Sequence, residues 1–181
     1  MEISREWAMP NKNTFNILPI REFVLKYLNK SKISIDPFAR NFDGATYTND
    51  LNPNTSAKYH MKAIDFLNML LDQKIRADLI IFDPPYSLEQ CKRSYESLDY
   101  KFTYEDTLYA INWKKEKNII KNLLIKKGIF LHFGWHSNGM GMSRGFIINK
   151  ILLVAHGGSH YDTICMAEEK TIQNRLKSFK L

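Results

Sequence analysis

The stretch Ala77-Asp-Leu-Ile-Ile-Phe-Asp-Pro-Pro-Tyr86 decides the fold that this sequence predicts. Its first part, Ala77–Asp83, is a nearly continuous apolar run, which is typical of a central parallel strand that is covered on both faces. Asp83-Pro84-Pro85-Tyr86 completes the stretch, and ligands of open α/β sheets bind at the carboxyl ends of such strands. The simpler interpretation is a tight turn, because proline is common in turns.

The segments around this strand predict an alternation of strands and helices. Such an alternation indicates an α/β domain with a mainly parallel sheet. The last two strands are too close in sequence for a helix between them, so we expect one of them to run antiparallel. The expected helices are Pro19–Lys30, a helix capped by Asp65, and Thr103–Lys127, which Gly128 would close. The expected further strands are Lys32–Asp36, Ala45–Thr48, Tyr59–Met61, Ile129–Phe133, Phe146–Ala155 and Tyr161–Ala167.

Composition limits the classes of protein that fit. With 181 residues, 44% of them hydrophobic, the chain is long and apolar enough for one folded core. It has 26 Lys and Arg against 19 Asp and Glu, a formal net charge of +7, so polyanions are plausible partners. The two cysteines form no disulfide framework, and we find neither a membrane span nor a secretion signal. We therefore expect a cytoplasmic protein without membrane attachment.

The Asp83-Pro84-Pro85-Tyr86 motif fits a specific chemistry. An exocyclic amino group of adenine or cytosine is a poor nucleophile, because its lone pair is delocalised into the ring. The Asp83 carboxylate and the Pro84 carbonyl would accept hydrogen bonds from this amino group, while the prolines fix the backbone. Tyr86 offers a flat face on which an extruded base can stack. This chemistry needs no metal, and the five histidines and two cysteines show no metal-ligand spacing.

These four residues resemble the catalytic motif of amino-group methyltransferases that use S-adenosylmethionine, above all the DNA adenine-N6 methyltransferases. Nearly the whole chain is similar to small adenine methyltransferases of phages and mobile elements. The similar segments are Met9–Phe15, Ser34–Ala39, Asn49–Pro53, Ala63–Leu67, Phe133–Gly139, Arg144–Phe146, Ile151–Gly158 and Asp162–Cys165. The resemblance implies a Rossmann-like methyltransferase fold with a mainly parallel seven-stranded sheet, one antiparallel strand near the C-terminus, S-adenosylmethionine as cofactor and DNA as substrate. It also implies a prokaryotic or phage-encoded protein.

The resemblance further implies which residues bind the cofactor. Asp36, Pro37 and Phe38 would lie near the methionine part of the cofactor, and Asp50 would bind its ribose hydroxyls. Asp65 and Phe66 would hold its adenine ring, and Asn13 and Thr14 would flank the cofactor. Each group also has a simpler interpretation. Asp50 fits a turn, Asp65 fits a helix cap, and the two phenylalanines fit an ordinary core.

One segment departs from the family pattern. The glycine motif Phe-x-Gly-x-Gly is replaced by Phe38-Ala-Arg-Asn-Phe42. Only 13 residues separate Asp36 from Asp50, which is too few for a crossover helix with its loops. We therefore expect a shortened first crossover, and weak or partner-dependent cofactor binding remains open.

Cations and aromatic residues near the motif predict where nucleic acid binds. These residues form two sets. One set lies in an expected loop, Leu88–Tyr100, directly after the motif. The other set lies in a glycine-rich segment that could close over the target base. The candidates are Lys92, Arg93 and Tyr95 in the first set, and Trp135, His136, Asn138 and Arg144 in the second. The basic segments Lys114–Lys127 and Lys170–Lys180 are further candidates, although the first is more simply a solvated helix face.

We expect residues 1–181 to form a single catalytic domain, with no separate target-recognition domain. Sequence choice would then come from the loops, from a homodimer or from a partner subunit. RNA adenine-N6 and DNA cytosine-N4 methylation remain alternatives, although the cytosine enzymes more often carry Ser in place of Asp83. A non-catalytic nucleic-acid-binding or partner subunit with the same fold is the alternative from another class.

Overall fold

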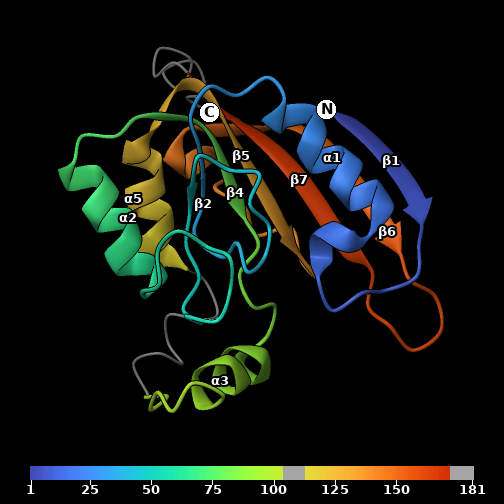
Figure 1. The fold of residues 1–181 in the computed structure, drawn as a ribbon. Helices are drawn as coiled ribbons and strands as arrows, with labels where there is room; N and C mark the ends of the chain where they lie inside the picture. Colours follow the sequence, from blue (N-terminus) through green and yellow to red (C-terminus); the bar gives the residue numbers. More distant parts are fainter. Residues whose placement is uncertain (104–112, 172–181) are drawn as a thin grey trace.

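A computed structural model of the chain describes residues 1–103 and 113–171, which form a single sheet with helices on both faces (Figure 1). The sheet has seven strands in the order β1-β6-β7-β5-β4-β2-β3. The strands are β1 (Glu2–Trp7), β2 (Ser34–Asp36), β3 (Tyr47–Thr48), β4 (Ala77–Phe82), β5 (Leu124–Gly134), β6 (Phe146–Ala155) and β7 (Thr163–Lys170).

Strand directions confirm the predicted fold class. β4 pairs in parallel with β2 and β5, while β2 pairs in parallel with β3, and β1 with β6. β7 lies between β5 and β6 and runs antiparallel to both. The result is a Rossmann-like, mainly parallel sheet with one antiparallel strand near the C-terminus. The first crossover is also short as predicted, because no helix lies between β2 and β3.

The alternating side chains of β4 join two hydrophobic cores. Leu79 and Ile81 point to one face of the sheet, where they belong to a core that includes residues of α1 (Leu18–Leu28). Ile80 and Phe82 point to the other face and pack with residues of α2 (Ala63–Asp72) and α5 (Lys114–Leu123). Because successive strand side chains point to opposite faces, a strand that is apolar throughout needs this cover on both sides.

Helix α3 (Leu88–Glu96) stands away from the sheet, on the side where β4 ends (Figure 1). The sequence prediction of a loop over Leu88–Tyr100 was wrong for this segment. The Ser87 hydroxyl accepts a hydrogen bond of 3.2 Å from the Gln90 amide, which caps the helix directly after the motif. Two 3₁₀ turns, Thr14–Asn16 and Met142–Arg144, complete the described elements.

Other predicted elements also need correction. β1 was not predicted, and Tyr59 forms only an isolated bridge with Asn49 instead of a strand over Tyr59–Met61. The N-cap of α2 is Lys62, so Asp65 lies in the first helical turn and does not cap the helix. Acidic residues are favoured both as N-caps and in the first helical turn, where the helix dipole stabilises their charge. For this reason the sequence pattern alone did not distinguish the two positions for Asp65.

The boundary between α5 and β5 lies earlier than predicted. α5 ends at Leu123, and the strand begins at Leu124, where the expected helix Thr103–Lys127 would have continued. The register of β5 against β4 shifts between the pairs Ala77–Leu124 and Leu79–Ile129. The extra residues form an irregularity in which Lys127 has a φ of 62°. The part of the expected helix at 104–112 lies outside the described residues.

No helix within 1–103 and 113–171 is both long and apolar enough to cross a bilayer. The basic tail Lys170–Lys180 lies almost entirely outside the described residues.

The loop between β5 and β6 depends on one buried carboxylate. Glu168 on β7 is 1% exposed and accepts hydrogen bonds from the amides of Met140 (2.6 Å) and Gly141 (2.9 Å). A Cβ atom on Gly139 would lie 1.9 Å from a Glu168 carboxylate oxygen. Only glycine therefore allows the loop to approach this carboxylate so closely.

Replacing Gly139 with alanine should lower the free energy of unfolding by about 1–3 kcal/mol, because the buried carboxylate must shift and lose its amide donors. Urea unfolding followed by circular dichroism measures this change. Gly134→Ala is the matched control, since its nearest neighbour would lie 3.5 Å from the new Cβ atom. Equal stability of the two variants would contradict the role of Glu168.

Candidate active site

A pocket of about 1100 Å³ lies where several parallel strands reach their carboxyl ends. Pro37 and Phe38 follow β2, Asp50 follows β3, and Asp83 follows β4, and all of them line it. The segment 10–14 and helix α3 line other parts of the wall. This pocket thus lies where the sequence predicts the site, at the carboxyl ends of the strands.

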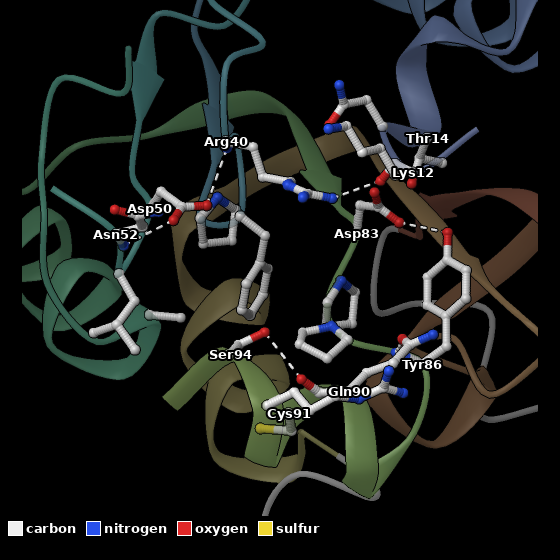
Figure 2. A pocket seen from close by; sticks show the side chains of 18 of the residues that line it. Lys12, Thr14, Arg40, Asp50, Asn52, Asp83, Tyr86, Gln90, Cys91 and Ser94 are labelled. Atoms are coloured by element: carbon white, nitrogen blue, oxygen red, sulfur yellow. Dashed lines mark hydrogen bonds between the residues drawn. The ribbon is translucent and has the colours of Figure 1, made fainter. Parts of the chain in front are cut away.

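Asp83 is held by several groups at this pocket. The Tyr86 hydroxyl donates a hydrogen bond of 2.6 Å to the Asp83 carboxylate (Figure 2). Burial raises the pKa of Asp83, while hydrogen bonds from Tyr86 and Thr14 and the charge of Arg40 act in the opposite direction. The site therefore balances the cost of desolvating a carboxylate against three groups that favour its charged form.

The motif continues into a fixed turn. Pro84 is buried, and the Tyr86 amide donates a hydrogen bond of 2.8 Å to the Gln90 side chain of α3. Burial raises the pKa of the Tyr86 phenol well above its ordinary value, and the nearby Asp83 charge adds to the shift. Tyr86 was predicted as a stacking face, but its hydroxyl also positions the carboxylate, a contact that the motif alone did not predict.

Asp36 lies beneath the pocket instead of lining it. Its side chain is fully buried, and one oxygen accepts a hydrogen bond of 3.0 Å from the Phe38 amide. The other oxygen has no hydrogen-bond partner. Burial raises the pKa of Asp36 well above its ordinary value, and the charges of Asp83 and Asp50 raise it further. This carboxyl group therefore shapes the turn after β2 through the Phe38 amide.

Asp50 lines the pocket at the end of β3, with part of its carboxylate already used. It accepts hydrogen bonds from the amides of Arg40 (3.1 Å) and Asn52 (2.8 Å), as Figure 2 shows. These two contacts support the turn interpretation. A carboxylate has about four acceptor positions, so Asp50 retains capacity for a ligand in the pocket.

Asn49 holds the pocket wall together and was missed by the sequence analysis. Its buried side-chain amide donates to the carbonyls of Pro37 (3.1 Å) and Met61 (3.0 Å) and accepts from the Met61 amide (3.1 Å). These bonds join the turn after β2 to the segment before α2. Each of these bonds joins residues that are 12 positions apart in the sequence, and residue spacing gave no signal for such contacts.

Arg40 occupies the middle of the segment Phe38–Phe42, which follows β2. Its backbone has a φ of 51°, in the left-handed region that glycine favours. Its guanidinium donates a hydrogen bond of 2.6 Å to the Lys12 carbonyl and thereby ties this segment to the N-terminal part of the wall (Figure 2).

Aromatic rings form the wall between the strand ends and α5. The Phe38 ring packs edge to face on Phe82 (5.3 Å between centroids) and on Trp113 (5.1 Å). Phe38 and Trp113 line the pocket, and so does Glu116, whose carboxylate has one oxygen without a partner. Burial raises the pKa of Glu116. Trp113 and Glu116 are additional candidate residues, and their positions at the start of a basic helix gave no sequence signal.

The structure brings most predicted residues to the pocket, though not all of them. Asn13 and Thr14 line it, as do Arg93, Tyr95 and Trp135. Two predicted cofactor residues lie elsewhere. Asp65 is exposed and does not line the pocket, and Phe66 is fully buried in the core against Tyr59. The simpler interpretation of Phe66 as a core residue therefore agrees with its placement.

Several predicted nucleic-acid contacts also lie away from this pocket. Lys92 is 3.6 Å from the Glu96 carboxylate on the same helix. The Asn138 carbonyl accepts a hydrogen bond from Lys117, and Arg144 donates to Asn118 and to the Met140 carbonyl. Asn138 and Arg144 therefore help to hold the loop between β5 and β6.

A smaller cavity of about 190 Å³ lies beside the motif and is lined by His132, His136 and Lys117. Burial, together with the charge of Lys117, lowers the pKa of His132 to about 3. Burial, together with the charge of Arg144, lowers the pKa of Lys117 to about 8. Among residues 1–103 and 113–171, no group of three or more His, Cys, Asp and Glu side chains could hold a metal ion.

The fold of this chain is similar to the folds of known proteins. Neither models of protein families nor curated protein sequences match the chain. Among solved structures, TrmN from Thermus thermophilus is 15% identical with a TM-score of 0.53, over 85% of this chain and 49% of TrmN. A SAM-dependent methyltransferase from Agrobacterium tumefaciens is 10% identical with a TM-score of 0.52, over 86% of this chain and 62% of that protein.

This chain has a Rossmann-like methyltransferase fold. The likeness covers most of this chain, whereas the chain spans about half the length of TrmN and less than two thirds of the Agrobacterium protein. The mainly parallel seven-stranded sheet, with β7 antiparallel near the C-terminus, agrees with the fold class that was predicted from the sequence.

Removing the Asn49 side chain should destabilise the protein by about 2–4 kcal/mol, because several buried backbone groups lose their partner. Asn49→Ala should also open the pocket wall, which thermal unfolding and limited proteolysis near Met61 would detect. Asn54→Ala is the matched control, since Asn54 is exposed at the same pocket. If Asn49→Ala were as stable as the control, Asn49 would not hold this wall.

Proposed function

We propose that this protein is an S-adenosylmethionine-dependent methyltransferase that acts on the exocyclic N6 amino group of adenine in DNA. The observation that carries the proposal is the Asp83 carboxylate. It emerges from the central buried strand into a large pocket and is held there by Tyr86. The methyltransferase fold supports the same reaction class.

The lining of the pocket fits the cofactor that the sequence resemblance implies. Asp50 has remaining acceptor capacity for ribose hydroxyls, and Phe38 and Trp113 offer apolar ring surfaces. Asn13, Thr14 and Pro37 lie on the same wall, whereas Asp36 supports it from beneath. When bound, this cofactor supplies an electrophilic methyl group. Lys62 and Ala63 line the pocket where α2 begins, whereas Asp65 and Phe66 do not. We therefore assign contact with the adenine ring of the cofactor to Lys62 and Ala63 instead of Asp65 and Phe66.

Asp83 has the capacity to accept an amino group. Tyr86 and Thr14 use part of its acceptor positions, and about two positions remain for the substrate. An N–H donor that faces Asp83 and the Pro84 carbonyl would have its nitrogen lone pair turned toward the electrophile. The proton that nitrogen loses after methylation would pass to the Asp83 carboxylate and then to solvent.

Positive charge at the pocket supports a nucleic acid as the target. The net charge of +7, together with Lys12, Arg40 and Arg93 at the pocket, suits a polyanion. RNA adenine-N6 and DNA cytosine-N4 methylation use the same donor and acceptor arrangement and are the alternative substrates. We further propose that residues 1–181 act as one catalytic domain in the cytoplasm and that a homodimer or a partner subunit supplies target recognition.

The direct test is mass spectrometry of nucleosides from DNA and RNA incubated with the protein and isotopically labelled cofactor. We expect labelled N6-methyladenine from DNA. Asp83→Ala should lower its formation by at least about a hundredfold, because the main acceptor is lost. Labelled N4-methylcytosine, or label only in RNA, would identify one of the alternatives.

Calorimetry with S-adenosylmethionine separates catalysis from cofactor binding. Asp83→Ala should bind the cofactor with near wild-type affinity, while Asp50→Ala should bind it about tenfold more weakly, because it loses hydrogen bonds to a charged group. Absence of binding in the wild type would favour the non-catalytic subunit. Wild-type methylation by Asp83→Ala would refute the role of Asp83.

The pH dependence provides an independent test of Asp83. Because the ionised form accepts the amino hydrogens and burial raises the pKa of Asp83, kcat/KM should fall as pH drops through this raised pKa. Tyr86→Phe keeps the ring and removes the hydrogen bond that lowers the pKa of Asp83. Its acid limb should therefore lie at higher pH than that of the wild type. An unchanged limb would show that another group controls the profile.

A further inference from the structure

A row of three aromatic rings leads from the candidate catalytic motif to the protein surface. The centroids of Tyr86 and Trp135 are 5.7 Å apart, and those of Trp135 and Tyr161 are 4.7 Å apart. All three residues line the large pocket. Exposure rises along the row to 36% for Trp135 and 70% for Tyr161, so the outer rings present open apolar surface beside the site.

The outermost ring stands on a firmly anchored turn. Tyr161 lies between β6 and β7, where Gly157 and Gly158 both have positive φ angles. His156, which is 6% exposed, closes the base of this turn. One ring nitrogen lies 2.8 Å from the Ala8 carbonyl, and the other lies 2.9 Å from the Thr163 hydroxyl. The protein thus fixes both ends of a turn whose aromatic side chain is left open to solvent.

We propose that Trp135 and Tyr161 form a stacking platform for the bases next to the target nucleotide, and that the strand enters the site single-stranded. The proposal rests on the proposed function and adds a substrate form and a binding residue, Tyr161, to it. Trp135 was a sequence candidate for nucleic-acid contact, whereas Tyr161 was not.

The arrangement favours bases over other partners for a physical reason. Stacking on an aromatic side chain is tolerant of base identity and needs a base whose face is free. In a duplex the faces are covered by neighbouring base pairs, so exposed rings beside a pocket gain contact only with unstacked bases. Arg93 and Lys12 line the same pocket and are placed to contact a phosphate backbone.

The test compares binding of a fluorescent oligothymidylate with binding of a duplex of equal length, by anisotropy in the presence of S-adenosylhomocysteine. We expect the wild type to prefer the single strand, and Tyr161→Ala to bind it about tenfold more weakly. Tyr161→Phe should retain the affinity because the ring remains. Met142→Ala is the control at another exposed apolar side chain, since Met142 is 63% exposed and does not line the pocket.

Salt dependence distinguishes stacking from charge. Tyr161→Ala should weaken binding equally at all salt concentrations, with the slope of log affinity against log salt unchanged. Arg93→Ala should reduce that slope by about one, because a phosphate contact is lost. Wild-type affinity of Tyr161→Ala, or tighter binding of the wild type to the duplex, would overturn the platform.

The outcomes also separate this proposal from the proposed function. If the wild type methylates DNA while Tyr161→Ala has the same KM for a single-stranded substrate, the platform is wrong and the enzyme assignment stands. If the oligonucleotide binds through Tyr161 and no methyl transfer is detected, the platform stands and the catalytic proposal fails.

Discussion

The burial of β4 on both faces is the constraint from which the candidate site follows. Its apolar side chains join the two cores, and the strand ends with the apolar run at Phe82, directly before Asp83. The carboxylate therefore lies at the end of a strand that is covered on both faces, and its burial raises its pKa and favours the neutral form. Tyr86, Thr14 and Arg40 oppose that effect, and they come from the motif itself, from the N-terminal segment and from the turn after β2.

Much of the fold could be predicted because hydrophobic patterning records burial. β4 and β6 are apolar where the structure buries them, and the short link before β7 required an antiparallel strand. β1 could not be predicted in this way, since it is an edge strand with mostly exposed side chains, held through backbone pairing with β6. The early end of α5 depends on the register irregularity in β5, which periodicity does not record.

The candidate site was partly predictable for a related reason. Residues that directly follow strands, such as Asp50 and Asp83, are brought together by any parallel sheet, and both line the pocket. Asn49 and Trp113 act through contacts between distant segments, which a single sequence does not reveal. Asp65 and Phe66 fit the pattern that the sequence resemblance implies, yet Asp65 is exposed to solvent and Phe66 lies in the core.

Arg40 links the unusual sequence of the first turn to the constraint on Asp83. The left-handed backbone costs an arginine roughly 1–2 kcal/mol that a glycine at this position would avoid. In return the guanidinium reaches the Lys12 carbonyl and contributes positive charge that lowers the pKa of the desolvated Asp83 carboxylate. Glycine would remove the strain together with both contributions. Arg40 thus gives the turn after β2 an electrostatic role, which ties this segment to the Asp83 carboxylate at the end of β4.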